Sequence, residues 1–362
     1  MDFWKSTDFF KLFLILGLVQ EDDAWNYGND NSRLRQSYSV VLNHMIHALH
    51  VLGGVEIKTN APVYQIQQQQ QHAVQTDSHG GGSGNVEDSG AIISYGNQKN
   101  EQTNNMRADR VVITVPPSVL KGPTPLLKCV PPLPIDQQNA INERNFGRAI
   151  KVFVLCSSHN GRNFWKNQTN AIHSLSTVAN TTNLICCCDP TMAFSQLWYD
   201  ERPGYNEFLI CGFVTSTRAD ELAKYCCDTK ATKMTFTNNS SSAPTSSSRN
   251  TIEQMLMAQL DVMFGTRDVP APCTEVTIKT TSYDWGTHPY VHGGYSSPQF
   301  EKKMDDDMDT KMKMRQMYGC LHFAGEATHE GACATTQSAV LSGQRAANEV
   351  IRVLQHFNAL KT

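Results

Sequence analysis

The chain has 362 residues, of which 40% are hydrophobic, and a formal net charge of −3. This length suits one large or two medium domains, and the hydrophobic content can build a substantial core. The slight acidity argues against nucleic acid as the main partner. Eleven cysteines include no Cys-x-x-Cys pair, so we expect no metal site. Their vicinal clusters favour a reduced, intracellular compartment.

The two ends of the chain carry no clear targeting signal. The apolar run from Phe9 to Val19 is too short to span a membrane and lacks the basic leader of a signal peptide. It therefore predicts a buried helix and no membrane span. Residues 359–362 form neither a peroxisomal Ser-Lys-Leu tail nor a membrane anchor. We expect a cytoplasmic location, with a peroxisomal one as the alternative.

The first third of the chain alternates short apolar segments with polar ones. Apolar residues at helical spacing predict a helix over 36–52 that Gly53 and Gly54 end. Residues 67–90, rich in Gln and Gly, are typical of a flexible loop. Strands are expected at 55–57, 63–66, 92–95 and 107–115.

The middle of the chain continues this irregular mixture. Helices are expected at 137–144 and 252–264, and strands at 149–155 and 208–214. Residues 238–250 form a second low-complexity loop. Residues 301–316, acidic and rich in Lys and Met, predict a solvated insertion. The mixture predicts an α/β (α+β mixed) fold of two interleaved lobes.

The last part of the chain is the most informative. An apolar strand from Leu321 ends at Gly325 and Glu326, and a helix rich in small residues starts at Thr335 and Thr336. A helix start offers unpaired N–H groups and a partial positive charge, where an electron-rich ring edge or a phosphate can sit. Glycine lets the backbone approach a ligand closely. The segment therefore predicts a ligand-binding strand–loop–helix unit.

Lys151 is the candidate for chemistry on the predicted strand 149–155. It shares one face of that strand with Phe153 and Leu155. Such neighbours predict partial desolvation, which lowers a lysine pKa and suits a base or a water-holding group. The alternative is an ordinary strand lysine that extends to solvent.

Several of these motifs resemble those of the flavin-dependent amine oxidases, in particular the spermine and acetylpolyamine oxidases. The closing run Phe-Ala-Gly-Glu-Ala-Thr-His over 323–329 is followed by Thr-Thr and by Leu-Ser-Gly-Gln-Arg over 341–345. The run Pro-Pro-Leu-Pro over 131–134 precedes Phe-Gly, Lys151-Val and Phe-Trp in the family's order. A third run over 285–296 reads Trp-Gly-x-x-Pro-Tyr, then Gly-Tyr-Ser.

The resemblance implies FAD as cofactor, bound non-covalently because Gly294 stands where monoamine oxidases carry the flavin-bound cysteine. In the family, the lysine that matches Lys151 hydrogen-bonds a water at flavin N5. Tyr295 and Thr335 would line the substrate site. The residues implied to bind the cofactor are Gly325, Glu326, Thr336, Trp285, Val63 and Pro116.

The activity implied is FAD-dependent oxidation of polyamines (spermine, spermidine or their acetylated forms), by hydride transfer to flavin N5 with O2 reduced to H2O2. The partners are then a small-molecule polyamine and O2, and the oligomeric state is open. Two alternatives remain. In the first, the chain is a truncated, inactive amine-oxidase-like protein or interaction module, which the absence of a Gly-x-Gly-x-x-Gly motif favours. In the second, it is a histone lysine demethylase-like oxidase.

The resemblance also implies a division of the chain, and it begins near residue 36. Residues 1–35 would be an N-terminal helical segment of the substrate lobe, and 36–120 a partial FAD-binding lobe. Residues 121–284 would be the substrate-binding lobe, and 285–362 the flavin-ring segment that returns to the FAD lobe. The expected fold is an incomplete FAD-binding lobe interleaved with a sheet-plus-helices substrate lobe.

Overall fold

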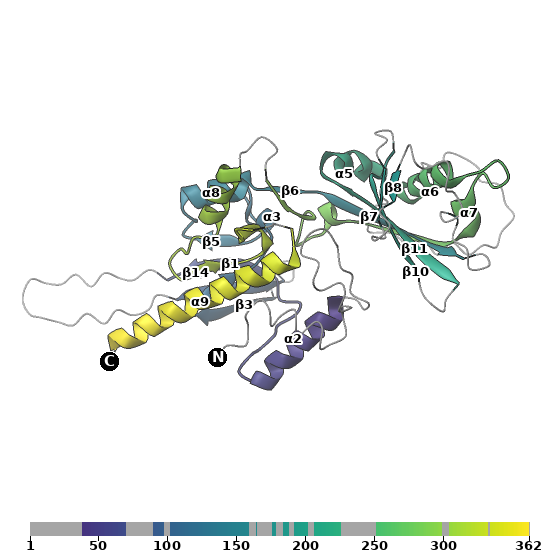
Figure 1. Cartoon of the computed structure of the whole chain (residues 1–362). Helices are drawn as coiled ribbons and strands as arrows, with labels where there is room; N and C mark the ends of the chain where they lie inside the picture. The colour runs from purple at the N-terminus through teal and green to yellow at the C-terminus, as the bar shows by residue number, and fades with distance from the viewer. Residues whose placement is uncertain are drawn as a thin grey trace, which may run out of the picture. The chain divides into compact units, whose positions relative to one another are not determined.

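The structure is a computed structural model that describes most of the chain from residue 38 onward (Figure 1). The described residues are 38–69, 90–97, 102–158, 164, 176–178, 184–187, 192–201, 206–225, 251–298, 304–331 and 334–361. They fall into two compact units: the first ends at Phe146 and resumes at Tyr295, and the second is Gly147–Gly294. The sequence had suggested boundaries after residues 120 and 284. The predicted helix at 9–19 and the loop at 238–250 lie outside the described residues.

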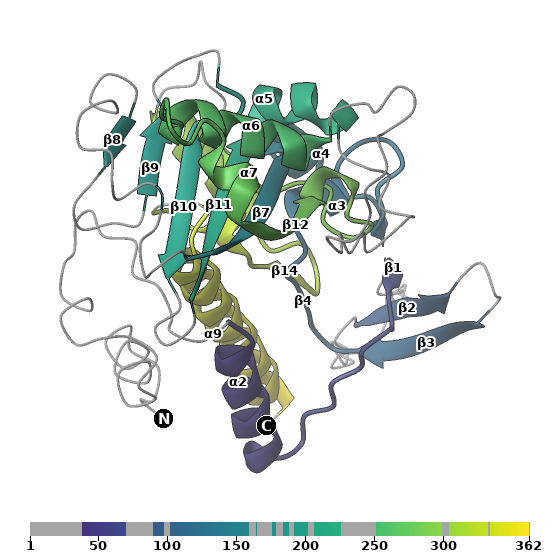
Figure 2. The same ribbon diagram turned by 90° about the vertical axis from the view of Figure 1, so that its right-hand side faces the viewer.

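The second unit is built on a six-stranded antiparallel sheet (Figure 2). In spatial order its strands are β12 (Thr277–Asp284), β7 (Ala149–Ser157), β11 (Glu207–Thr215), β10 (Gln196–Glu201), β9 (Leu184–Cys187) and β8 (Ser176–Val178). Side chains of a strand alternate between the two faces of its sheet. On β7 the residues Ile150, Val152 and Val154 are fully buried, whereas Lys151 between them is exposed.

Helices cover the apolar face of this sheet (Figure 2). They are α5 (Ser216–Leu222), the 3-10 turn η4 (Ala223–Tyr225), α6 (Ile252–Phe264) and α7 (Pro272–Val276). Helix α6 begins at a capping box, in which Thr251 and Gln254 satisfy each other's backbone N–H groups. Its Leu256 and Leu260 pack with the buried residues of β7 in one hydrophobic cluster. The core of the second unit thus lies between sheet and helices.

The first unit contains three small sheets. Four strands pair in the order β3 (Gln102–Ala108), β2 (Ala91–Asn97), β1 (Val63–Gln68) and β5 (Lys128–Val130). Strand β4 (Val111–Ile113) pairs in parallel with β14 (Leu321–Phe323), and β6 (Asn145–Gly147) pairs with β13 (Tyr295–Ser297). All three residues of β14 are buried.

Helices surround these sheets in the first unit. They are α2 (Tyr38–Leu52), α3 (Pro117–Leu120), α4 (Ile135–Glu143), α8 (Met304–Met314) and α9 (Thr336–Lys361), with the 3-10 turn η6 (Glu326–Thr328). Helix α8 packs against α4 and η6, and α9 packs against η6 and β14. Within the described part of the chain, no helix combines the length and apolar character that a membrane crossing requires.

The mixed α/β fold expected from the sequence is confirmed. The helices predicted at 36–52, 137–144 and 252–264 are present as α2, α4 and α6, and the helix predicted after Thr335 is α9. The strands predicted at 63–66, 92–95, 149–155 and 208–214 are β1, β2, β7 and β11.

Two strand predictions were wrong. Residues 55–57 form no strand, and Val55 and Ile57 are each 43% exposed without a pairing partner among the described residues. The single strand expected over 107–115 is two strands, β3 and β4, separated at Asp109 and Arg110. The break has a physical reason, since β3 pairs with β2 in one sheet and β4 pairs with β14 in another.

The solvated insertion predicted at 301–316 was also wrong in part. This segment forms α8, in which Thr310 and Lys311 are each only 6% exposed and Met314 only 3%. Because so many residues of this segment are charged, the sequence did not reveal that one face of helix α8 is buried. Helix α9 is only partly covered: Ala346 is buried, whereas Ile351 is 46% exposed.

Candidate functional site

In the second unit, Lys151 occupies the sheet face opposite the helices. The register of the sheet places Phe213 of β11 on one side of it and Tyr283 of β12 on the other. The Lys151 Nζ lies 5.5 Å from the centre of the Phe213 ring, a cation–π distance. The predicted desolvation was wrong, because Lys151 is exposed on this face. Lys151 is therefore open to a ligand, and aromatic residues of the two neighbouring strands flank it.

A cluster of aromatic rings continues from Tyr283. The Trp285 ring meets Tyr283 edge-on at 4.9 Å and stacks on His288 at 5.5 Å, with 25° between the ring planes. Tyr290 packs edge-on against His288 at 6.3 Å. Trp285 is 36% exposed, so part of the cluster is open to solvent. The sequence analysis identified Trp285 but not Phe213 and Tyr283. These two residues are distant from Lys151 in sequence, and only the pairing of the strands brings them next to it.

Trp285 is held by the residue before it. Asp284 is 3% exposed, and its carboxylate accepts from the Gly286 N–H at 2.8 Å and from Arg148 Nη1 at 3.0 Å. These bonds fasten the 3-10 turn η5 (Trp285–Thr287) to the end of β12. A β-carbon on Gly286 would lie 2.6 Å from the Arg148 side chain, so a larger residue here would displace Arg148 from this ion pair.

In the first unit, two predicted cofactor residues follow neighbouring parallel strands. Pro116 comes after β4 and caps α3, while Gly325 comes after β14. The carboxyl ends of parallel strands meet at the same edge of a sheet, which is the usual ligand-binding edge of α/β folds. Gly325 has φ +121°, a conformation that residues with a β-carbon rarely adopt. Val63 begins β1 in the other sheet and is 41% exposed.

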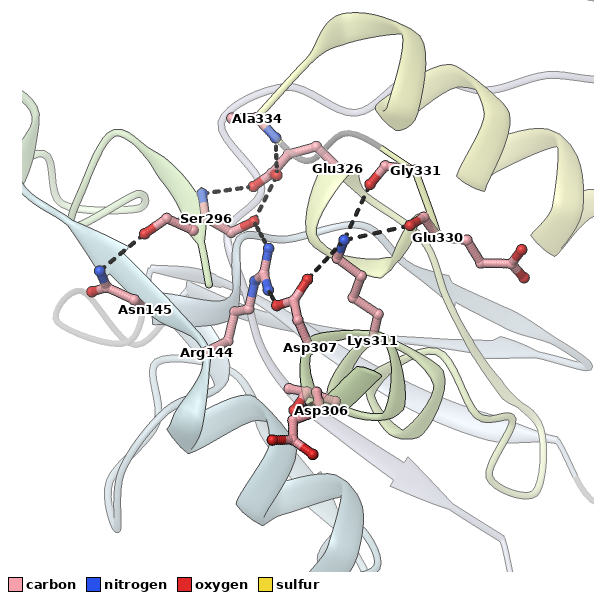
Figure 3. A network of polar contacts seen from close by, with 12 residues as sticks. Arg144, Asn145, Ser296, Asp306, Asp307, Lys311, Glu326, Glu330, Gly331 and Ala334 are labelled. Carbon is pink, nitrogen blue, oxygen red and sulfur yellow. Dashed lines mark hydrogen bonds and ion pairs between the residues drawn. The ribbon is translucent and has the colours of Figure 1, made fainter. Parts of the chain in front are cut away.

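Glu326 joins three segments by hydrogen bonds (Figure 3). Its carboxylate accepts from the Ser296 N–H at 3.0 Å, from the Ser296 Oγ–H at 2.7 Å and from the Ala334 N–H at 2.7 Å. Tyr295, the predicted substrate residue, precedes Ser296 on β13 and is 38% exposed. Glu326 therefore fixes the strand of Tyr295 and the segment that leads into α9.

The start of α9 is set by Thr335. Its Oγ1 accepts from the Ser338 N–H at 3.2 Å, as an N-cap side chain does. The N–H groups of Thr336 and Gln337 lie in the first turn of this helix, where the helix itself supplies no acceptor, and both residues are exposed. This first turn offers two outward donors and the positive end of a helix of 26 residues.

His329 closes the turn after η6. Its Nδ1 accepts from the Gly331 N–H at 3.0 Å. Burial lowers the pKa of His329, so the ring stays neutral and its Nδ1 keeps the lone pair that this bond requires. The neutral ring thereby supports the turn from His329 to Gly331.

The donor set of the first unit fits the ring end of a flavin. That ring offers carbonyl and nitrogen acceptors, which suit the exposed amides of the first turn of α9. The pyrophosphate end has no counterpart of the usual kind, because the sequence contains no Gly-x-Gly-x-x-Gly turn. Lys151 and Trp285 belong to the second unit, which carries its own exposed ammonium group and aromatic ring.

The sequence matches the family model of flavin-containing amine oxidoreductases over residues 2–351. The chain therefore belongs to this family, whose cofactor is a flavin. The match begins well before residue 36, where the resemblance read from the motifs started.

The relatives agree with this family in fold. A redesigned putrescine oxidase superposes with a TM-score of 0.56 at 17% identity, covering 89% of this chain and 54% of that one. Cyclohexylamine oxidase from Brevibacterium oxydans superposes with a TM-score of 0.51 at 16% identity, covering 81% and 48%. Lysine-specific histone demethylase 1 homolog 3 of Arabidopsis thaliana is 26% identical over 250 residues, which are 69% of this chain and 12% of that protein. The chain thus spans about half the length of the solved structures that it matches.

Proposed function

We propose that this chain supplies the flavin-ring and substrate-binding parts of an oxidase that acts on polyamines. The proposal rests on membership of the flavin-containing amine oxidoreductase family and on the surroundings of Lys151. Its finer part, the polyamine, rests on the resemblance of the motifs to spermine and acetylpolyamine oxidases.

The observation that carries the proposal is the exposed Lys151 between two aromatic rings. Phe213 and Tyr283 flank it on the open face of the sheet, and Trp285 extends the aromatic surface. Aromatic faces attract ammonium groups, so this surface suits an aliphatic amine. A fixed ammonium group such as Lys151 can orient a water molecule at a reacting atom.

Each predicted residue then has a role. FAD, bound without a covalent link, would take a hydride from the carbon next to the amine nitrogen and pass two electrons to O2, giving H2O2. Lys151 would hold a water at flavin N5, and Trp285 and Tyr295 would shape the amine site. Thr335 would face the substrate. Gly325, Glu326, Thr336, Pro116 and Val63 would hold the cofactor.

The first test is whether the purified chain binds FAD and then oxidises amines. We expect flavin absorbance to remain with the chain after gel filtration, and H2O2 to form with spermine or acetylspermine. Absence of bound flavin would contradict the proposal and favour an inactive interaction module. The exposed apolar residues of α2 are one observation in favour of such a module, since Leu42 is 57% exposed and Leu52 is 77% exposed.

A methylated lysine peptide belongs in the same assay, because one relative is named as a histone demethylase. H2O2 with the peptide and none with polyamines would replace the polyamine proposal with a demethylase-like activity. We expect the polyamines to give the signal.

Lys151→Met tests the proposed role of the lysine. We expect H2O2 formation to fall by roughly 10²–10⁴-fold, as when a group that assists proton transfer is removed, while FAD remains bound. Lys279→Met is the matched control, because Lys279 is an exposed lysine on β12 of the same sheet. Equal activity of the two variants would exclude Lys151 from the reaction.

A further inference from the structure

Helix α8 carries two Asp–Lys pairs with the same spacing but opposite environments. The Asp309–Lys313 pair is exposed, with side chains 62% and 45% accessible. The Asp307–Lys311 pair, with 3.0 Å between Lys311 Nζ and Asp307 Oδ2, is only 13% and 7% accessible. Charges are buried at a cost unless hydrogen bonds surround them. The inner pair therefore needs an explanation that the outer pair does not.

The inner pair is one part of a continuous polar chain (Figure 3). Asp307 also accepts from Arg144, a residue at the end of α4 whose side chain is 1% exposed. Arg144 Nη2 donates to Ser296 Oγ at 3.2 Å, and Ser296 in turn donates to Glu326. Two cations and two carboxylates alternate along this chain, so its charges balance within the interior of the first unit.

The two ends of the polar chain hold Gly331 and Ala334, which both precede α9. Lys311 Nζ donates to the Gly331 carbonyl at 3.1 Å and lies 3.5 Å from that of Glu330, while Glu326 accepts from the Ala334 N–H. Ala334 has φ +63°, a left-handed conformation that is unfavourable for alanine. Such a conformation persists only where the surroundings impose it. The next residue is Thr335, the N-cap of α9.

We propose that Arg144, Asp307 and Lys311 are positioning residues that hold Glu330, Gly331 and Ala334 before α9 and thereby aim the first turn of α9 at its ligand. The proposal rests on the proposed function for the identity of that ligand, the flavin ring. None of the three side chains is needed at the reacting atoms. They act through Glu326 and through the backbone carbonyls before α9.

Lys311→Met is the test, with Lys313→Met as its matched control on the same helix. In the flavin-free chain, we expect Lys311→Met to speed amide hydrogen exchange across 326–340 by roughly 10-fold or more, the effect of losing a hydrogen bond to a charged group. FAD affinity, measured by quenching of flavin fluorescence, should weaken by roughly the same factor. Lys313→Met should leave both unchanged, and Lys311→Arg should recover most of the loss.

Asp307→Asn is a second variant, because it keeps the side-chain shape and weakens both ion pairs. It should speed exchange in the same peptide. Normal exchange in 326–340 and normal FAD affinity in folded Lys311→Met or Asp307→Asn would overturn the positioning role. If the unmodified chain binds no FAD, the proposed function fails, whereas the exchange measurement still decides whether these residues hold the start of α9.

Discussion

Gly325 has a backbone conformation that only glycine adopts readily, with φ +121° and ψ +161°. Its proposed approach to a ligand stays a prediction. Its N–H donates to Ser342 Oγ at 2.9 Å, which ties the turn after β14 to the body of α9. A side chain here would strain the turn whatever space lies around it.

Gly325→Ala should therefore destabilise the first unit by about 1–3 kcal/mol, the usual cost of a strained backbone conformation, and weaken FAD binding. Urea unfolding and flavin fluorescence measure the two effects. The control is Gly343→Ala inside α9, where a β-carbon meets no described atom within 4 Å. That change should stabilise the helix by about 0.5–1 kcal/mol. Similar unfolding curves for both variants would contradict this account.

The turn η5 shows how an element, rather than a residue, places an aromatic ring. The Trp285 ring lies where it does because Asp284 fastens the turn to β12 and to Arg148. Arg148 also reaches Asp220 with 3.2 Å between Nε and Oδ1, but the Asp220 side chain is 64% exposed. The buried carboxylate should therefore matter far more than the exposed one.

Asp284→Ala should lower the free energy of unfolding by about 1.5–3 kcal/mol, the range for hydrogen bonds to charged groups. It should also change the near-UV circular dichroism that Trp285 contributes. Asp220→Ala, which removes the other partner of Arg148, should cost no more than about 1 kcal/mol. Chemical denaturation of both variants measures the difference. A larger loss for Asp220→Ala would show that Asp284 is not what holds the turn.

At the scale of the whole molecule, the described residues form two separate hydrophobic clusters, one in each unit. Each cluster contains a buried thiol that can report on it. Burial raises the pKa of Cys129 in the first unit to about 11. The neighbouring Cys156 thiol, and then burial, raise the pKa of Cys273 in the second unit. Neither thiol should react with an alkylating reagent while its unit is folded.

Two unfolding transitions are expected, because multidomain proteins commonly depart from two-state behaviour. Pulsed iodoacetamide labelling in a urea series, read by mass spectrometry of the Cys129 and Cys273 peptides, should give two different midpoints. Total tryptophan fluorescence gives the global curve for comparison. A single shared midpoint for both thiols would show that the units unfold as one.

Much of the site could be predicted from the sequence because it lies in continuous motifs. Gly325, Glu326, Thr335 and Thr336 are neighbours along the chain, and their turn and cap are local conformations. The alternation of β7 likewise places Lys151, Phe153 and Leu155 on one face, as predicted. The apolar neighbours of Lys151 suggested burial, but that face of the sheet is open, because burial depends on what covers the sheet.

Only the tertiary structure determines which side chains that are far apart in sequence contact each other. Arg144 bonds to Ser296, 152 residues away, and to Asp307, 163 residues away. In sequence, Asp307 and Lys311 were indistinguishable from Asp309 and Lys313 in the same charged run. Periodicity and local propensity fix the elements and their faces, since they act over a few residues. The packing of α8 against α4 and η6 buries the Asp307–Lys311 pair and leaves the Asp309–Lys313 pair exposed to water.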